Sequence, residues 1–108
     1  MTLFDEISQL LAAPADGADA PPLARLEDTL TAGYARALAL EAERWRLERR
    51  IGEVAAALQD ESSELRTDEI AKLAARLSDA DGELSRLRGL LSTLRVRASD
   101  LRVTEASN

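Results

Sequence analysis

The feature that most constrains this chain is a set of apolar residues that recur at alternating steps of three and four. One run spans residues 23–58, and a second spans residues 70–101. This heptad spacing places one apolar stripe, here called a seam, along one side of an α-helix, and it is typical of helices that pair along their length. The first seam is Leu23, Leu26, Leu30, Gly33, Ala37, Leu40, Arg44, Leu47, Ile51, Val54 and Leu58, and the second is Ile70, Leu73, Leu77, Ala80, Leu84, Leu87, Leu91, Leu94, Ala98 and Leu101.

The composition and the break between the seams favour an all-α fold built on a hairpin. Aromatic residues make up only 3% of the chain, so the core is aliphatic, and the abundant Ala, Leu, Arg and Glu favour helices. The step from Leu58 to Ile70 fits neither continued heptad, which argues against one unbroken helix. We therefore predict a long antiparallel, coiled-coil-like helical hairpin over residues 23–103, with a turn near residues 61–66.

The sizes of the seam residues distinguish two registers of this hairpin. The preferred register pairs Gly33 with Leu91 and Arg44 with Ala80, so that each small residue meets a large one. The alternative, displaced by one heptad, places Gly33 beside Ala98 and leaves a void of the kind that destabilises a core.

Charged residues beside the seams do not decide the register. Exposed ion pairs are worth about 0–1 kcal/mol each, so packing outweighs them. The residues that the preferred register brings near each other are Glu27 with Arg95, Glu43 with Glu83, and Arg50 with Arg76.

A second stripe, made mostly of small residues, recurs at the same spacing on the outer side of each helix. Gly82 and Gly89 belong to it, although each glycine costs about 1 kcal/mol relative to alanine in a helix interior. Trp45 and Leu38 also lie on an outer stripe, and an apolar patch of that size needs cover. The alternative is that the small residues simply face water. The residues that we predict to form a helix–helix interface are Tyr34, Leu38, Ala42, Trp45, Ser78, Gly82, Ser85, Gly89 and Ser92.

Association between chains is the assembly that this outer stripe favours. A chain of 108 residues has a thin core on its own and gains from burying more surface. We expect a homodimer in which two hairpins form a four-helix bundle, although a higher oligomer fits the pattern as well. In the dimer, Trp45 of one chain lies in a groove lined by Gly82, Ser85 and Gly89 of the other.

Arg44 occupies a seam position where an aliphatic side chain is expected. One interpretation is that its side chain leaves the seam towards Glu41 or Glu48, while Ala80 makes room for its stem. The other is that a polar seam residue fixes the register or the choice of partner.

The N-terminal segment is a second candidate for binding. Residues 1–12 form a short amphipathic helix, and residues 13–22 form a flexible linker rich in Ala, Pro, Asp and Gly. At the other end of the chain, residues 104–108 are expected to be a disordered tail. The helix either docks into a groove of a partner or folds back over its own bundle near Leu23 and Val103. Its docking residues are Leu3, Phe4, Ile7, Leu10 and Leu11.

The residue types present exclude most catalytic chemistry. Without His and Cys, the chain has neither a Ser-His or Cys-His nucleophile pair nor an imidazole or thiolate metal site. We therefore expect no enzymatic activity, no catalytic residue, no cofactor and no metal. The acidic cluster of Asp60, Glu61, Glu64, Asp68 and Glu69 is interpreted as a solvated helix tip.

Charge and hydropathy limit the partners. The net charge of −6 argues against general affinity for nucleic acid or for an anionic membrane, because both require a dense positive surface. The N-terminus has neither the basic region nor the apolar stretch of a signal peptide, so we expect a cytoplasmic protein. Five arginines in residues 86–108 form a locally basic end, interpreted mainly as a solvated face: Arg86, Arg88, Arg95, Arg97 and Arg102.

Together these patterns predict a non-enzymatic structural or interaction protein. In the first interpretation it is an oligomeric helical hairpin that acts as an adaptor, scaffold or regulator. Its partners are then a second copy of itself and another protein. In the alternative it is a small helical chaperone for a secretion or assembly system, and it holds the amphipathic helix of a partner.

Overall fold

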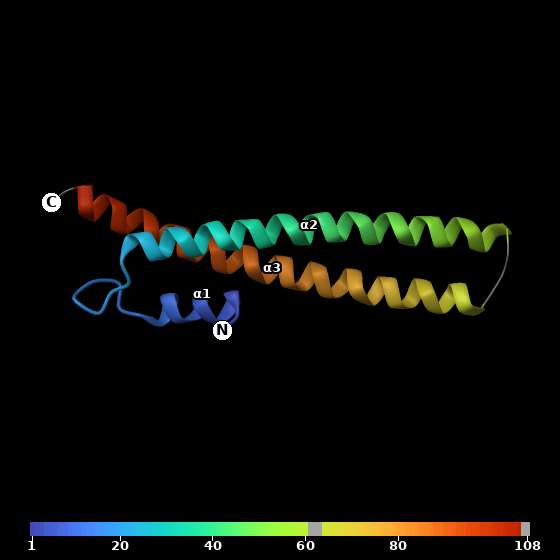
Figure 1. The fold of residues 1–108 in the computed structure, drawn as a ribbon, viewed down its shortest axis with the longest axis horizontal. Helices are drawn as coiled ribbons and strands as arrows, with labels where there is room; N and C mark the ends of the chain where they lie inside the picture. The colour runs from blue at the N-terminus through green and yellow to red at the C-terminus, as the bar shows by residue number, and fades with distance from the viewer. Residues whose placement is uncertain (61–63, 107–108) are drawn as a thin grey trace. The chain divides into compact units, whose positions relative to one another are not determined.

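The computed structural model describes residues 1–60 and 64–106, and all regular structure in these residues is α-helical. Helix α1 spans Leu3–Ala12, α2 spans Leu23–Asp60 and α3 spans Glu64–Ala106 (Figure 1). The two long helices, α2 and α3, run antiparallel and pack against each other, which confirms the predicted all-α hairpin. Of the predicted turn near residues 61–66, residues 61–63 lie outside this description and residues 64–66 belong to α3.

The chain is divided into two compact units. Unit 1 comprises Met1–Ala37 and Arg86–Asn108, and therefore contains α1, the first part of α2 and the last part of α3. Unit 2 comprises Leu38–Ser85, the remaining parts of α2 and α3. Each unit has its own buried seam residues.

Unit 1 has a core to which three helices contribute. Ile7 of α1 and Leu87 of α3 are fully buried, and Leu26 of α2 is 1% exposed. Gly33 lies against Leu91, so closely that a Cβ atom at position 33 would overlap that leucine side chain. The contact between Gly33 and Leu91 is the one that the preferred register predicts, and the alternative register is wrong in this unit.

Helix α1 begins at a capping box and ends before a proline. Oγ1 of Thr2 accepts a hydrogen bond from the backbone N–H of Asp5, and the Asp5 carboxylate accepts one from the backbone N–H of Thr2, both at 3.2 Å. Pro14 follows the C-cap residue Ala13, whose N–H donates to the carbonyl oxygen of Gln9. The helix buries Ile7 and leaves Leu10 2% exposed, so it packs on its own unit.

Unit 2 has a two-helix core. Leu47, Val54 and Leu73 form a buried cluster, and Ile51, Ile70 and Leu77 pack against it while remaining partly exposed. All of these are residues of the predicted seams, contributed by α2 and α3 alone.

The ion pairs beside the seams are not the neighbours that the preferred register brings together, of which only Glu27 and Arg95 carry opposite charges. In unit 1, Nε of Arg102, and not Arg95, lies 3.1 Å from Oε1 of Glu27. In unit 2, Glu43 pairs with Arg76 and Arg50 pairs with Glu69 at 4.0 and 2.8 Å. Each partner lies one heptad away from the predicted one, because long charged side chains lean along the helix until they meet an opposite charge.

The end of α3 also differs from the prediction. Residues 104–106, which we expected to belong to a disordered tail, continue the helix to Ala106. No glycine or proline interrupts the chain there, and the hydroxyl of Thr104 donates to the carbonyl oxygen of Asp100 at 3.0 Å. Residues 107 and 108 of the predicted tail lie outside the described residues.

Candidate protein interaction surfaces

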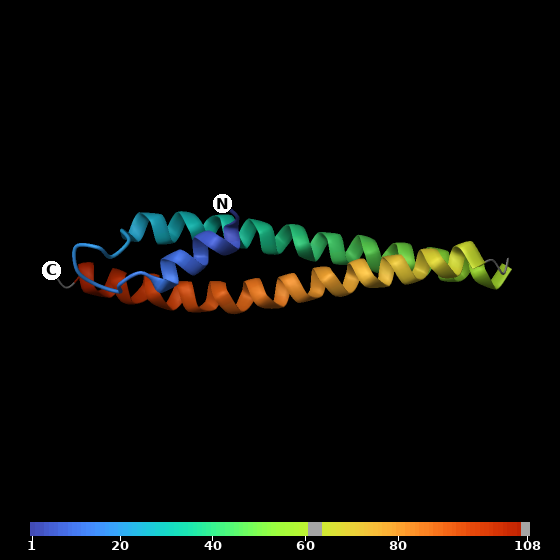
Figure 2. The same cartoon turned by 90° about the horizontal axis from the view of Figure 1, so that it is seen from below.

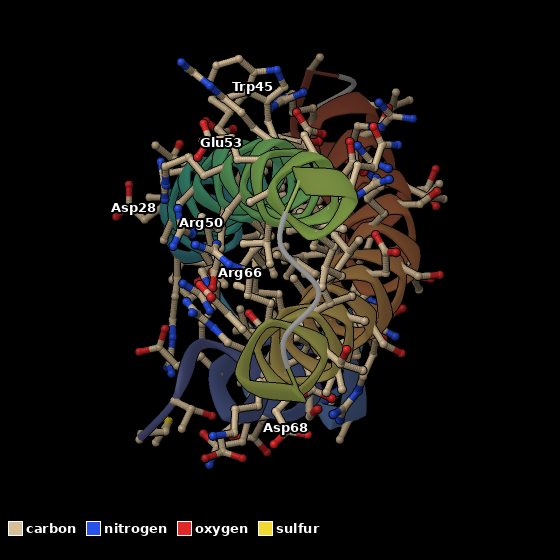
Figure 3. The ribbon with its side chains drawn as sticks, turned by 90° about the vertical axis from the view of Figure 1, so that its right-hand side faces the viewer. Asp28, Trp45, Arg50, Glu53, Arg66 and Asp68 are labelled. Carbon is tan, nitrogen blue, oxygen red and sulfur yellow. The ribbon has the colours of Figure 1, made fainter. Side chains whose placement is uncertain are left out.

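The first candidate surface is the outer side of α2 in unit 2. Leu38 is 67% exposed and Trp45 is 59% exposed, and the small residue Ala42 between them is exposed as well. Figure 3 shows Trp45 projecting from α2 on the side away from α3. Because residues three and four apart share one face of a helix, the three side chains form a single stripe, here called the Leu38–Trp45 stripe.

The charges beside this stripe are of both signs, since Glu41 lies four residues before Trp45 and Glu48 three residues after it. The guanidinium of Arg49 lies over the ring of Trp45, 5.3 Å from its centroid, in a cation–π arrangement. Arg46, the next residue along the chain, is exposed, and within the described residues it makes no ion pair. The Leu38–Trp45 stripe is therefore an apolar surface bordered by charges of both signs, with Arg46 and Arg49 near Trp45.

The outer side of α3 carries small residues and a negative charge. In unit 2, Ser78, Gly82 and Ser85 are exposed, and a Cβ atom at Gly82 would meet no atom within 4 Å. Asp79 is exposed beside them and, in the described part of the chain, has no ion-pair partner. Nothing within unit 2 therefore explains why position 82 is a glycine.

The remaining predicted interface residues are also exposed, but in unit 1. Tyr34 is 43% exposed, Gly89 has open space beside it, and Ser92 is exposed. The structure therefore leaves all nine predicted interface residues accessible from outside their own unit. It does not test whether a second chain binds them.

Arg44 leaves the seam, as the first of our two interpretations expected. Its side chain is 37% exposed, and Nη2 lies 3.5 Å from Oε1 of Glu48. Its Nε pairs with Asp81, a contact that we did not predict, and the seam residue Ala80 is buried. Arg44 thus joins α2 to α3 through charge within unit 2.

A second ion pair, between Arg50 and Glu69, also joins these helices. Nη2 of Arg50 donates to Oε1 of Glu69 at 2.8 Å, and this hydrogen bond raises the pKa of the arginine above its usual value. A raised arginine pKa stabilises the fold at every pH below the unfolded value, which already lies far above neutrality. Arg50 therefore stays charged across the physiological pH range, and its pair with Glu69 is structural.

The second candidate surface is the site in unit 1 that α1 occupies, here called the α1 groove. The guanidinium of Arg86 lies over the ring of Phe4, 4.6 Å from its centroid, near the start of α1. Near the end of α1, the guanidinium of Arg97 donates hydrogen bonds to backbone carbonyl oxygens. Since Phe4 meets Arg86 and the end of α1 meets Arg97, α1 runs in the same direction along the unit as α3, and it is inclined to α3 (Figure 2). This position is along the unit, and not at the end near Val103, which remains 64% exposed.

Arg97 is the functional residue that sequence reasoning missed. Its Nη1 donates to the carbonyl oxygens of Leu10, Leu11 and Ala13 at 2.9, 2.9 and 3.2 Å. These carbonyls have no partner within α1, because the last turn of a helix leaves its acceptors unsatisfied. A cation at a helix C-terminus also interacts favourably with the helix dipole. The sequence shows Arg97 only as one of several arginines, with no signal for a carbonyl partner more than eighty residues away.

The described residues contain neither a metal-holding cluster nor a membrane-spanning helix. No group of three His, Cys, Asp or Glu side chains among them is arranged to hold a metal ion. None of the helices, as far as the structure describes them, is long and apolar enough to cross a membrane.

Comparison with protein-family models found no match, and comparisons with curated proteins and with solved structures found none either.

Proposed function

We propose that the protein is a non-enzymatic interaction protein that associates with a second copy through the outer faces of unit 2. The observation that carries this proposal is the exposure of Leu38 and Trp45 on one stripe, without any packing partner from α3. Contacts of this kind suit a scaffold, adaptor or regulator, in which the helical hairpin provides a rigid surface.

The outer face of α3 in unit 2 is complementary to this stripe in shape and in charge. The exposed Trp45 is large, whereas Gly82 is flanked by Ser78 and Ser85, and small residues allow two helices to approach closely. Arg46 beside the stripe is positive and Asp79 beside the glycine is negative. The proposed contact places Trp45 of one copy against Gly82 and Ser85 of the other, within a dimer or larger assembly of hairpins.

The contact needs more than two large side chains. A stable interface buries about 800 Å² on each partner, and a tryptophan supplies at most about 250 Å² of that. The small residues along both outer stripes supply the remaining area, which agrees with an interface that extends over several helical turns.

Light scattering after size-exclusion chromatography tests the association. We expect the wild-type mass to exceed that of one chain, and to fall to one chain in the Leu38→Glu plus Trp45→Glu variant. Val103→Glu is the matched control, because Val103 is equally exposed but belongs to unit 1. A wild-type protein that stays monomeric at all accessible concentrations contradicts the proposal.

A charge exchange tests which faces meet. Arg46→Asp and Asp79→Arg are each expected to weaken association, because each places like charges opposite one another across the contact. Combined in one chain, the two changes restore opposite charges and are expected to recover the wild-type mass. Additive weakening in the double variant rules out this pairing of faces, even if the protein associates in another way.

A further inference from the structure

The first relevant feature is the way in which α1 is connected to the unit whose groove it occupies. The only covalent link from α1 to the rest of unit 1 is the connection of residues 13–22, which is mostly exposed and loops away before returning to α2 (Figure 1). This connection passes through Gly17, at a φ of 91° that favours glycine. A flexible link of this kind permits α1 to leave the groove while the rest of the chain stays folded.

The contacts that hold α1 are ones that many amphipathic helices provide. Phe4, Ile7 and Leu10 recur at steps of three, the spacing of one apolar helix face. Arg97 contacts only backbone carbonyls at the helix end, and every helix offers such carbonyls in its last turn. The groove therefore recognises an apolar spacing and a helix C-terminus, and only in part the particular side chains of α1.

The segment that follows α1 leaves space unfilled. A pocket of about 500 Å³ lies beside Arg97, between the connection after α1 and the helices α2 and α3. Small or short residues of the connection border it, among them Pro14 and Ala15. Its apolar walls come from Leu26, Val96 and Leu101. A helix followed by a large apolar residue fits this site better than α1, which is followed by Ala13, Pro14 and Ala15.

The residues beside the seams in unit 1 also suit a bound helix. Thr29 is 7% exposed and Leu90 is half-buried, although neither belongs to a seam. Both side chains are uncharged, so an apolar helix face covers them without removing a charge from water.

We propose that the α1 groove is a binding site for the amphipathic helix of a partner protein, and that α1 is an exchangeable occupant. The partner helix carries large apolar residues in the spacing of Phe4, Ile7 and Leu10. A large apolar residue follows its last turn and enters the pocket beside Arg97. The proposal is independent of association through the Leu38–Trp45 stripe.

The tether sets how tightly the partner must bind. A short flexible link gives α1 an effective concentration of roughly 1 mM beside its groove. A free peptide displaces α1 only when the ratio of its concentration to its dissociation constant exceeds the ratio of that effective concentration to the dissociation constant of α1. Releasing α1 is therefore expected to strengthen the apparent binding of a competing peptide by roughly tenfold or more.

Peptide binding to the full chain tests the proposal. In the Ile7→Asp plus Leu10→Asp variant, α1 loses the two side chains that the groove buries. A fluorescent peptide of residues 1–16 is expected to bind this variant at least tenfold more tightly than the wild-type chain. The same peptide with Ala15→Leu is expected to bind more tightly still, and adding Arg97→Met to the chain is expected to weaken both. A variant that retains its helical circular dichroism and binds neither peptide overturns the proposal.

A second measurement covers a variant that fails to fold. A protease site replacing residues 15–18 of the full chain allows α1 to be freed without changing the groove. We expect the labelled peptide to exchange into the cleaved protein and to displace the native segment. Unfolding on cleavage, or failure of the peptide to exchange, shows that α1 is permanent core and overturns the proposal.

Two further results separate this site from the others. Leu38→Glu plus Trp45→Glu is expected to leave peptide binding unchanged, whatever it does to the mass of the protein. A wild-type dimer that becomes monomeric in the Ile7→Asp plus Leu10→Asp variant shows instead that α1 is exchanged between two copies of this chain. That result overturns the assignment to a partner protein.

Discussion

Unit 1 and unit 2 are built from the same two helices, and they differ in whether a third helix covers their seams. In unit 1, α1 adds Ile7 and Leu10 to the core. In unit 2, the partly exposed Ile51, Ile70 and Leu77 lie at the edge of a two-helix core. The seams continue through both units with the same spacing, so they do not explain the difference.

The residues beside the seams do explain it. Thr29 of α2 and Leu90 of α3 are uncharged and at least half-buried in unit 1. At multiples of seven residues from Thr29, unit 2 has Glu43 and Arg50, and at the same spacing from Leu90 it has Arg76 and Glu69. An apolar helix laid over those four charges would remove them from water at a cost of several kcal/mol. The seam thus pairs α2 with α3, and the uncharged Thr29 and Leu90 favour a third helix, while Arg97, seven residues after Leu90, binds the end of that helix.

The largest effect that separates the units is expected from leucine truncation in their cores. Leu87 is fully buried in unit 1 and Leu73 is 8% exposed in unit 2. We expect Leu87→Ala to lower the free energy of unfolding by about 3–5 kcal/mol and Leu73→Ala by about 2–3 kcal/mol, because a two-helix core collapses more easily around a cavity. Chemical denaturation of both variants measures the difference. Equal losses contradict the view that α1 makes unit 1 the more tightly packed region.

The next effect tests how α1 is held. Arg97→Met keeps most of the apolar stem and removes the guanidinium that binds three carbonyl oxygens. Losing hydrogen bonds from a charged donor is expected to cost about 1–3 kcal/mol. Amide hydrogen exchange in α1 is expected to accelerate by about tenfold or more, with little change at the buried residues of unit 2. Uniform acceleration in both units shows that α1 does not open separately.

A smaller effect compares two glycines under the same substitution. Gly33→Ala places a methyl group into the side chain of Leu91, whereas Gly52→Ala meets no atom within 4 Å. We expect the first to destabilise by about 1–2 kcal/mol through overpacking and the second to stabilise by up to about 1 kcal/mol through helix propensity. Thermal denaturation of the two variants checks the opposite signs. If both substitutions stabilise the protein, Gly33 does not determine the register of the hairpin.

These glycines also show how far the sequence could predict the fold. Heptad spacing predicted the seams, and residue size alone predicted that Gly33 meets Leu91, because a missing side chain in a core is filled by a large one. The neighbours of the charged residues were not expected to decide the register, and Glu27, Glu43 and Arg50 pair with residues one heptad away from those directly across. A long side chain can cover that distance, so spacing does not determine its partner.

The binding surfaces were predictable to different degrees. An outer stripe with Trp45 and Leu38 follows from helical spacing, and whether it binds a second copy stays a prediction. The position of α1 was not predictable, because an amphipathic helix on a tether suits its own bundle and a partner equally well. The contact of Arg97 with α1 was not predicted, because its acceptors are backbone carbonyl oxygens. Every residue has one, so the sequence does not show which of them accept a hydrogen bond.

The smallest effect is expected from the charges beside the seam in unit 2. Arg50→Met and Glu69→Gln each remove one member of an exposed pair, so we expect little change in stability at physiological salt. At low salt, where charges are screened less, a small loss is expected in each single variant, with no further loss when they are combined. The hydrogen bond from Arg50 to Glu69 raises the arginine pKa, so lowering the pH from 9 to 7 leaves this arginine charged and its contribution unchanged. Chemical denaturation at two salt concentrations measures these changes in the free energy of unfolding. A large, salt-independent loss shows that the pair does more than keep unit 2 free of a third helix, and that the charges beside the seam also hold α2 and α3 together.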